Sequence, residues 1–154
     1  VCEDNRIAAT TPTRSMTAGD GASARARAFG IETREVDGND VEAVDAAAAG
    51  LVALVRAGRP ALLHAVTYRI KGHVSVDPGT YRDADEVAQA QRDDPLARTR
   101  SRLLSLGEGA AAEAVDAEVA REIAAALAAA EAAPWPSPEA AFEDVITTGA
   151  GQWR

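Results

Sequence analysis

An almost unbroken apolar run occupies residues 61–66, between Pro60 and a polar stretch. A run of this kind predicts a strand that is covered on both faces of a sheet. The segment before it carries apolar residues at helical spacing, which predicts an amphipathic helix. These residues are Val41, Val44, Ala48, Leu51, Val52 and Val55. Earlier in the sequence, residues 31–36 predict a short strand, and residues 19–28 predict a helix that stops at Gly30.

Strands and helices that alternate with short connections predict a parallel sheet with helices packed against it. In such a sheet, the loops that leave the carboxyl ends of the strands share one edge, where ligands bind. Segments 3–7, 37–40 and 68–82 are therefore expected to lie along one edge, although they are distant in sequence. The spacing of Asn39 and Glu42 is that of a capping box, which predicts that Asn39 caps the helix that follows.

The second half of the sequence predicts helices. Residues 83–93 and 96–106 predict two helices separated by Pro95, because proline disfavours helix in the residue before it. Residues 110–132 predict an alanine-rich helix with one narrow apolar stripe, which suggests a single partner surface. Residues 142–146 are expected to form a final docking segment.

Composition argues against several classes of protein. Twenty-four Asp and Glu against sixteen Lys and Arg give a net charge of −8, which argues against a nucleic-acid partner. The single cysteine, Cys2, excludes an internal disulfide and cysteine-based zinc sites, and it favours a cytoplasmic location. The longest apolar run, residues 123–130, is far shorter than the ~20 residues that cross a bilayer, so no membrane association is expected. Because the sequence begins at Val1 with no initiator methionine, we expect a piece of a longer chain.

Residues 67–82 form the most unusual stretch, since they follow the buried strand and bring together His73, several cations and two tyrosines. Guanidinium and imidazole groups bind phosphate oxygens strongly, which predicts an anionic ligand. The alternative is a polar loop in which Arg69 and Arg82 pair with nearby carboxylates and His73 faces solvent.

Other polar residues have simpler interpretations. His64 lies inside the apolar strand and is expected to be a hydrogen-bonded core histidine. Residues 3–5 offer oxygen ligands for a hard cation such as Mg²⁺, or form a plain turn. Asp83 and Asp85 are expected to begin a helix rather than to bind a metal. Residues 19–21, Gly-Asp-Gly, are a weak phosphate-loop signal because they do not directly follow a strand.

Several motifs occur together in an order that is typical of one enzyme family. They are Cys2-Glu3-Asp4-Asn5, Thr11-Pro12-Thr13, Phe29-Gly30-Ile31, Val36-Asp37-Gly38-Asn39-Asp40-Val41, Thr67-Tyr68-Arg69, Gly72-His73 and Tyr81-Arg82. In this order they resemble the carboxyl-terminal half of the alpha subunit of thiamine-diphosphate-dependent 2-oxo acid dehydrogenases, of the pyruvate, branched-chain and acetoin types. Asp94-Pro95 and the closing Phe142-Glu143-Asp144-Val145 also fit, so the resemblance spans nearly the whole chain.

The resemblance implies a division of the chain and a set of site residues. Residues 1–82 would be the carboxyl-terminal part of an α/β cofactor-binding domain, that is, a partial thiamine-diphosphate-binding fold. Residues 83–154 would be a helical subunit-packing region.

By the same resemblance, Asn5 ligates the Mg²⁺ that holds the cofactor diphosphate, and Ile7 offers its backbone carbonyl. His73 matches a catalytic loop histidine near the diphosphate and the reaction centre, and Arg69 matches a residue that orders that loop. The family's metal-binding aspartate falls before Val1.

Three positions depart from the family's pattern. Asp4 replaces a commoner asparagine, and Ile7 replaces a commoner tyrosine. Val74 stands where animal relatives carry a regulated serine, so phosphorylation is not expected at that position, although Ser75 remains.

The implied function is that of a fragment of the decarboxylating component of a 2-oxo acid or acetoin dehydrogenase. This component carries out oxidative decarboxylation with thiamine diphosphate and Mg²⁺ and passes the acyl unit to a lipoyl group. The implied partners are the beta subunit, in an α2β2 assembly, and a lipoyl-bearing acyltransferase. Which 2-oxo acid is used, or whether acetoin is, is left open. The alternative is a non-catalytic fragment that docks subunits. A stand-alone nucleotide-binding domain ranks last, because the glycine-rich strand-to-helix turn is missing.

Overall fold

The computed structural model describes residues 1–142 of the chain. Its main sheet has three parallel strands in the order β1–β5–β4. These strands are β1 (Cys2–Asp4), β4 (Glu32–Asp37) and β5 (Ala61–Val66). The register aligns Asp4, Val66 and Asp37 in one row, so all three strands end at the same edge.

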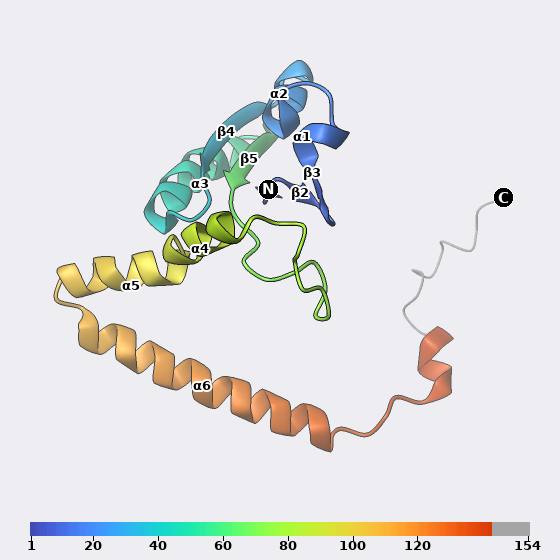
Figure 1. Ribbon diagram of the computed structural model, residues 1–154, viewed down its shortest axis with the longest axis vertical. Helices are drawn as coiled ribbons and strands as arrows, with labels where there is room; N and C mark the ends of the chain where they lie inside the picture. The colour runs from blue at the N-terminus through green and yellow to red at the C-terminus, as the bar shows by residue number, and fades with distance from the viewer. Residues whose placement is uncertain (143–154) are drawn as a thin grey trace. The chain divides into compact units, whose positions relative to one another are not determined.

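The central strand is β5, and its apolar run predicts that both of its faces are covered. Leu63 and Ala65 point to one face of the sheet and His64 to the other, because side chains alternate along a strand. All three are buried, so both faces of β5 are covered at this point. The helices α2 (Gly21–Ala28) and α3 (Val41–Arg56) pack against β4 and β5 (Figure 1). The predicted α/β fold, a parallel sheet flanked by helices, is confirmed.

A short antiparallel ribbon follows β1. It consists of β2 (Ile7–Ala8) and β3 (Thr11–Pro12) and leads into the single-turn helix α1 (Thr13–Met16). Two-residue strands are too short to produce a periodic pattern, which is why the sequence does not reveal them. The turns that form the ribbon place Arg6 and Ala9 in the left-handed region, at φ +61° and +54°.

The prediction that Asn39 caps α3 is wrong. The helix begins one residue later than a cap at Asn39 requires, and Asp40 is its cap: the Asp40 carboxylate accepts a 3.0 Å hydrogen bond from the Ala43 amide. Asn39 is buried instead, with its side chain hydrogen-bonded to Thr67 and to the Asp93 carbonyl. Residue spacing does not distinguish these two uses of an amide side chain, because both satisfy its polar atoms.

Two helices follow the loop after β5, and both begin as predicted. In α4 (Ala84–Arg92) the Asp83 carboxylate accepts hydrogen bonds from the Asp85 and Glu86 amides. This confirms that Asp83 and Asp85 begin a helix. The next helix, α5 (Pro95–Ser105), has Pro95 as its first residue, a position that needs no amide hydrogen.

The chain divides by compactness into Val1–Gly109 and Ala110–Arg154. The long helix α6 (Gly109–Ala132) and the 3₁₀ helix η1 (Pro138–Phe142) lie at and beyond this boundary. The division after residue 82 concerns function rather than compactness and stays a prediction. Of the predicted docking segment, residues 143–146 lie outside the described part of the chain. In residues 1–142, no helix has the length and apolar character needed to span a membrane.

Candidate functional site

A cleft of about 820 Å³ opens at the carboxyl edge of the sheet. Segments that follow all three strands line it: Asn5, Arg6 and Ile7 after β1, Asn39 after β4, and Thr67, Tyr68, Tyr81 and Arg82 after β5. One side is closed by residues of α4, including Glu86, Gln89 and Ala90. The prediction that these distant segments share one edge is confirmed, because the strands are parallel and in register.

The turn after β1 is held by the side chains of its own first residues. The Asp4 carboxylate accepts a 2.8 Å hydrogen bond from the Arg6 amide, and the Asn5 amide oxygen accepts one of 3.0 Å from the Ile7 amide. The Arg6 carbonyl in turn accepts from the amide and the hydroxyl of Thr13, at 2.9 and 3.1 Å. These bonds hold Arg6 in its left-handed conformation and place Asn5 and Ile7 on the wall of the cleft.

Thr67 joins the turn after β5 to both neighbouring segments. Its amide donates a 2.9 Å hydrogen bond to the Asp4 carbonyl, which continues the sheet by one residue. Its hydroxyl donates a 2.8 Å bond to Asn39 Oδ1, and Asn39 Nδ2 donates to the Asp93 carbonyl at 3.4 Å. Asn39 therefore supports the floor of the cleft, a role that its sequence position did not indicate.

Arg69 connects the 67–82 loop to the ribbon after β1. Its Nη2 donates a 2.6 Å hydrogen bond to the Ala9 carbonyl and a 3.0 Å bond to the Tyr81 hydroxyl. Arg82 donates to the Arg69 carbonyl, and its guanidinium lies 5.7 Å and 5.8 Å from the ring centroids of Tyr68 and Tyr81. These acceptors are carbonyl and phenol oxygens, whereas the sequence-based alternative expected carboxylates.

Asp77 organises the outer part of the same loop. Its carboxylate accepts from the amides of His73 and Gly79, at 2.6 and 2.8 Å, and from the Tyr81 hydroxyl at 2.9 Å. The two amides, followed by Tyr81 and the charge of Arg82, hold the pKa of Asp77 below its ordinary value of 3.8. Sequence reasoning missed this residue. The Asp-Pro-Gly triplet at 77–79 is the available signal, since aspartate before proline and glycine is typical of a turn.

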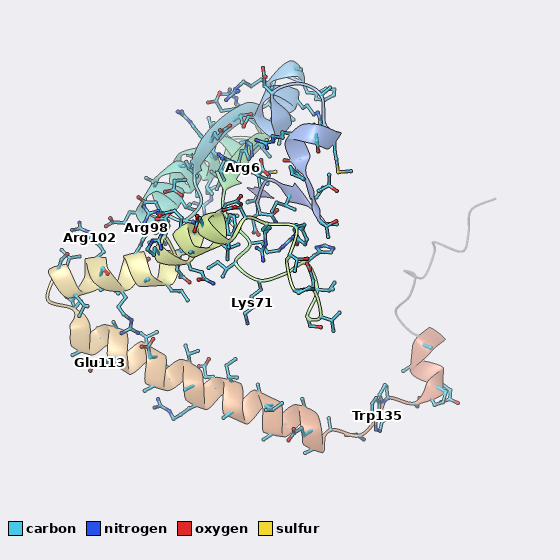
Figure 2. The ribbon with its side chains drawn as sticks, viewed as in Figure 1. Arg6, Lys71, Arg98, Arg102, Glu113 and Trp135 are labelled. Atoms are coloured by element: carbon cyan, nitrogen blue, oxygen red, sulfur yellow. The ribbon has the colours of Figure 1, made fainter. Side chains whose placement is uncertain are left out.

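The four residues that the family resemblance singles out occupy two places. Asn5 and Ile7 line the cleft, while Arg69 and His73 lie in the loop beside it. His73 is exposed, as the alternative expects, and its Nδ1 lies 3.3 Å from Arg69 Nη1. A guanidinium can donate but not accept, so this geometry leaves the ring proton on His73 Nε2. Lys71, next along the loop, extends away from it (Figure 2).

The donors that face the cleft are suited to a diphosphate and its metal ion. Arg82, which lines the cleft, has an Nε that is shielded from solvent and has no acceptor within residues 1–142. The Nε of Arg69, in the loop beside the cleft, also has no acceptor in these residues. Phosphate oxygens are strong acceptors for such groups. No cluster of three or more His, Cys, Asp or Glu within residues 1–142 is arranged to hold a metal ion. On the segment after β1, the donors that line the cleft are the Asn5 amide and the Ile7 backbone carbonyl, which are hard oxygens. They suit Mg²⁺, because this ion typically takes one or two protein ligands and completes its shell with water and phosphate.

The turn after β4 is tied to α5 by an ion-pair group. Arg98, labelled in Figure 2, bonds Asp37 at 2.8 Å and reaches Asp40 and Asp93 at 3.3 Å. The hydrogen bond from Arg98 is the largest cause of the lowered pKa of Asp37. This ion-pair group holds the end of α4 and the start of α5 against the turn after β4.

Comparison with known proteins gives a consistent result. Residues 1–139 match the model of the family described as dehydrogenase E1 component. The chain is 37% identical over 158 aligned residues to the human mitochondrial 2-oxoisovalerate dehydrogenase subunit alpha, with 99% of this chain and 36% of the human subunit covered. It is 35% identical to the pyruvate dehydrogenase E1 component subunit alpha of Rhizobium meliloti, with 95% of this chain and 43% of that subunit covered. The chain thus spans about two fifths of the length of these relatives.

Proposed function

The chain belongs to the dehydrogenase E1 component family, and from this premise we propose that it works as part of the alpha subunit of a 2-oxo acid dehydrogenase. The proposed reaction is thiamine-diphosphate-dependent oxidative decarboxylation with transfer of the acyl unit to a lipoyl group. The observation that carries the proposal is the meeting of the Asn5 turn and the 67–82 loop, which the Arg69 hydrogen bond to Ala9 holds together.

The proposed roles follow from the donors on each segment. Asn5 and the Ile7 carbonyl would hold Mg²⁺, and Arg82, which lines the same cleft, would donate to the diphosphate. When bound, thiamine diphosphate supplies the nucleophilic carbon and the electron sink that loss of carbon dioxide requires. The protein's task is then to position charged groups and to keep them in place through the cycle.

His73 has a separate proposed role at the rim of the site. Its backbone is fixed by Asp77, and Arg69 holds the ring so that Nε2 carries the proton. An exposed imidazole can donate a hydrogen bond to an oxygen that develops negative charge. It would pass its proton to the lipoyl sulfur that is released when the S–S bond opens and the other sulfur takes the acyl unit.

The proposed partners are a beta subunit, in an α2β2 assembly, and a lipoyl-bearing acyltransferase. The relatives differ in the substrate that their names state, 2-oxoisovalerate or pyruvate, so this chain's own substrate stays open, with acetoin as a third candidate. The cytoplasmic location that the single cysteine favours stays a prediction.

A second candidate function is subunit docking without chemistry, and the surface of α6 favours it. Its apolar stripe, Val115, Val119, Ile123 and Leu127, is between 50% and 65% exposed. Apolar stripes of this kind commonly pack against another chain. The two candidates are distinguished by whether the cleft residues affect a reaction.

The test is lipoyl acylation by the assembled component, with the alpha subunit carrying this chain. His73→Ala is expected to lower the rate of acylation by about 10²–10⁴-fold, the range for loss of a general acid or base. Lys71→Ala is the control, because Lys71 is on the same loop but extends away from it. Equal rates for wild type and His73→Ala would contradict the catalytic role and favour the docking function.

A further inference from the structure

A buried histidine lies behind the Asn5 turn and takes no part in the site described above. His64 is 4% exposed, and it joins four elements through its ring. Its Nε2 lies 3.0 Å from Asp4 Oδ2 on β1. Its Nδ1 lies 2.7 Å from the hydroxyl of Ser23 on α2 and 3.2 Å from Glu35 Oε2 on β4. The prediction of a hydrogen-bonded core histidine is confirmed.

A serine, a histidine and an aspartate in a row are also the components of a hydrolytic triad, but the geometry here excludes that use. Ser23 is 1% exposed, and neither Ser23 nor His64 lines the cleft. A nucleophile must reach the carbonyl that it attacks, and this hydroxyl is enclosed between α2 and the sheet. The function of the group must therefore pass through a residue that contacts the turn lining the cleft.

Asp4 is that residue, because its two carboxylate oxygens face in different directions. Oδ2 accepts from His64 Nε2, and Oδ1 accepts from the Arg6 amide at 2.8 Å. The carboxylate is thus held at both ends, with the histidine on one side and the left-handed turn on the other.

The orientation of the imidazole is fixed in turn by Ser23. An ionised carboxylate can accept but not donate, so Nε2 carries a proton toward Asp4. At Nδ1, the Ser23 hydroxyl at 2.7 Å and Glu35 Oε2 at 3.2 Å both lie within reach, and these contacts fix the plane of the ring. The chain of contacts therefore runs from α2 through Ser23, His64 and Asp4 to the turn that presents Asn5.

We propose that His64 is a positioning residue for the magnesium–diphosphate end of the cofactor. It holds Asp4 so that Asp4 fixes the Arg6 amide, and this keeps Asn5 and the Ile7 carbonyl on the wall of the cleft. The inference rests on the proposed function, since it assigns His64 to the support of that same site.

The test uses two substitutions of His64 that separate its ring nitrogens. The amide nitrogen of His64→Gln reaches the place of Nε2 and still donates to Asp4. In His64→Asn the shorter side chain reaches Ser23 but not Asp4. The measured quantity is the dissociation constant of Mg²⁺ at saturating thiamine diphosphate, by calorimetry on the assembled component. His64→Asn is expected to raise it by about 10-fold or more, as for loss of a group that supports a metal ligand. His64→Gln should stay within about twofold of wild type.

Substitution of Asp4 tests the same His64–Asp4 contact through its other partner. Asp4→Ala removes the acceptor of the Arg6 amide and should raise the Mg²⁺ dissociation constant to a similar extent, even if His64→Asn fails to fold. If both residues act through one contact, the double variant should bind Mg²⁺ no more weakly than the weaker single variant. Glu35→Gln is the control, because Glu35 contacts His64 but not the turn.

The results separate this proposal from the proposed function. Equal Mg²⁺ affinity in wild type and His64→Asn would overturn the positioning role, and so would equal weakening by His64→Gln and His64→Asn. If the wild-type component binds no thiamine diphosphate with Mg²⁺, the proposed function fails and the positioning role fails with it. Tight binding by wild type together with unaltered binding by both Asp4→Ala and His64→Asn would refute the positioning role alone.

Discussion

Arg69 donates a 2.6 Å hydrogen bond to the carbonyl of Ala9, a residue sixty positions earlier in the chain. This bond links the loop after the central strand to the ribbon after the first strand. It brings the two segments that carry the proposed site together without any charged partner on the ribbon side. The planar guanidinium suits this arrangement, because one Nη2 group also reaches the Tyr81 hydroxyl, at 3.0 Å.

Arg69→Lys is expected to detach the loop from the ribbon although the charge is kept. A lysine ammonium cannot reproduce the fork that contacts Ala9, Tyr81 and His73 together. Loss of such hydrogen bonds costs about 1–3 kcal/mol of local stability, which allows the loop to open more often. Cleavage after Tyr81 by chymotrypsin should therefore become faster. Lys71→Arg is the matched control, and equal cleavage rates in the two variants would contradict this account of Arg69.

The stability of the 67–82 loop should depend on pH through the ionisation of Asp77. The amides of His73 and Gly79 lower its pKa in the folded loop, so the carboxylate is bound more tightly when it is charged. The stabilisation is fully present above the ordinary pKa of 3.8 and is lost as the pH falls through the lowered value. The amide proton resonance of His73 should accordingly shift upfield in acid. In Asp77→Asn this titration should be absent, and its persistence there would show that another group controls the loop.

Substitution of Gly72 by alanine tests the backbone packing of the 67–82 loop, and the same substitution at Gly50 on α3 is its control. A Cβ at Gly72 would collide with the Asp77 carbonyl oxygen and approach its Cβ to 2.8 Å, whereas a Cβ at Gly50 on α3 meets nothing within 4 Å. Gly50→Ala should raise the free energy of unfolding by about 0.5–1 kcal/mol, because alanine loses less backbone entropy in a helix. Gly72→Ala should disorder the loop. Denaturant unfolding and His73 amide exchange measure the two effects, and a loop unaffected by Gly72→Ala would contradict the described packing.

Local patterns in the sequence predicted most of the elements of the α/β part. The apolar run at 61–66, the helical spacing of 41–55 and the positions of Pro95 and Asp83 each act within a few residues, so they are legible without a structure. The shared sheet edge could also be predicted, because parallel strands place their carboxyl ends together.

The remaining features depend on partners that are distant in sequence. The position of β5 between β1 and β4 arises from pairings over about sixty and thirty residues, which no local pattern encodes. Asn39 was misassigned because its Thr67 partner is 28 residues away. Ser23 was not recognised as a partner of His64, since a small residue in an Ala/Arg helix carries no signal of burial.

The central claim is that Asn5 holds the metal ion of a cofactor diphosphate at the edge of the sheet. It is tested most directly by calorimetry of thiamine diphosphate binding to the assembled component, with and without Mg²⁺. Wild type and Asp20→Ala, a control outside the cleft, should show Mg²⁺-dependent binding. Asn5→Ala should weaken that binding by about 10-fold or more, as loss of a metal contact does. Binding that is equal in Asn5→Ala and wild type, or that ignores Mg²⁺, would contradict the account.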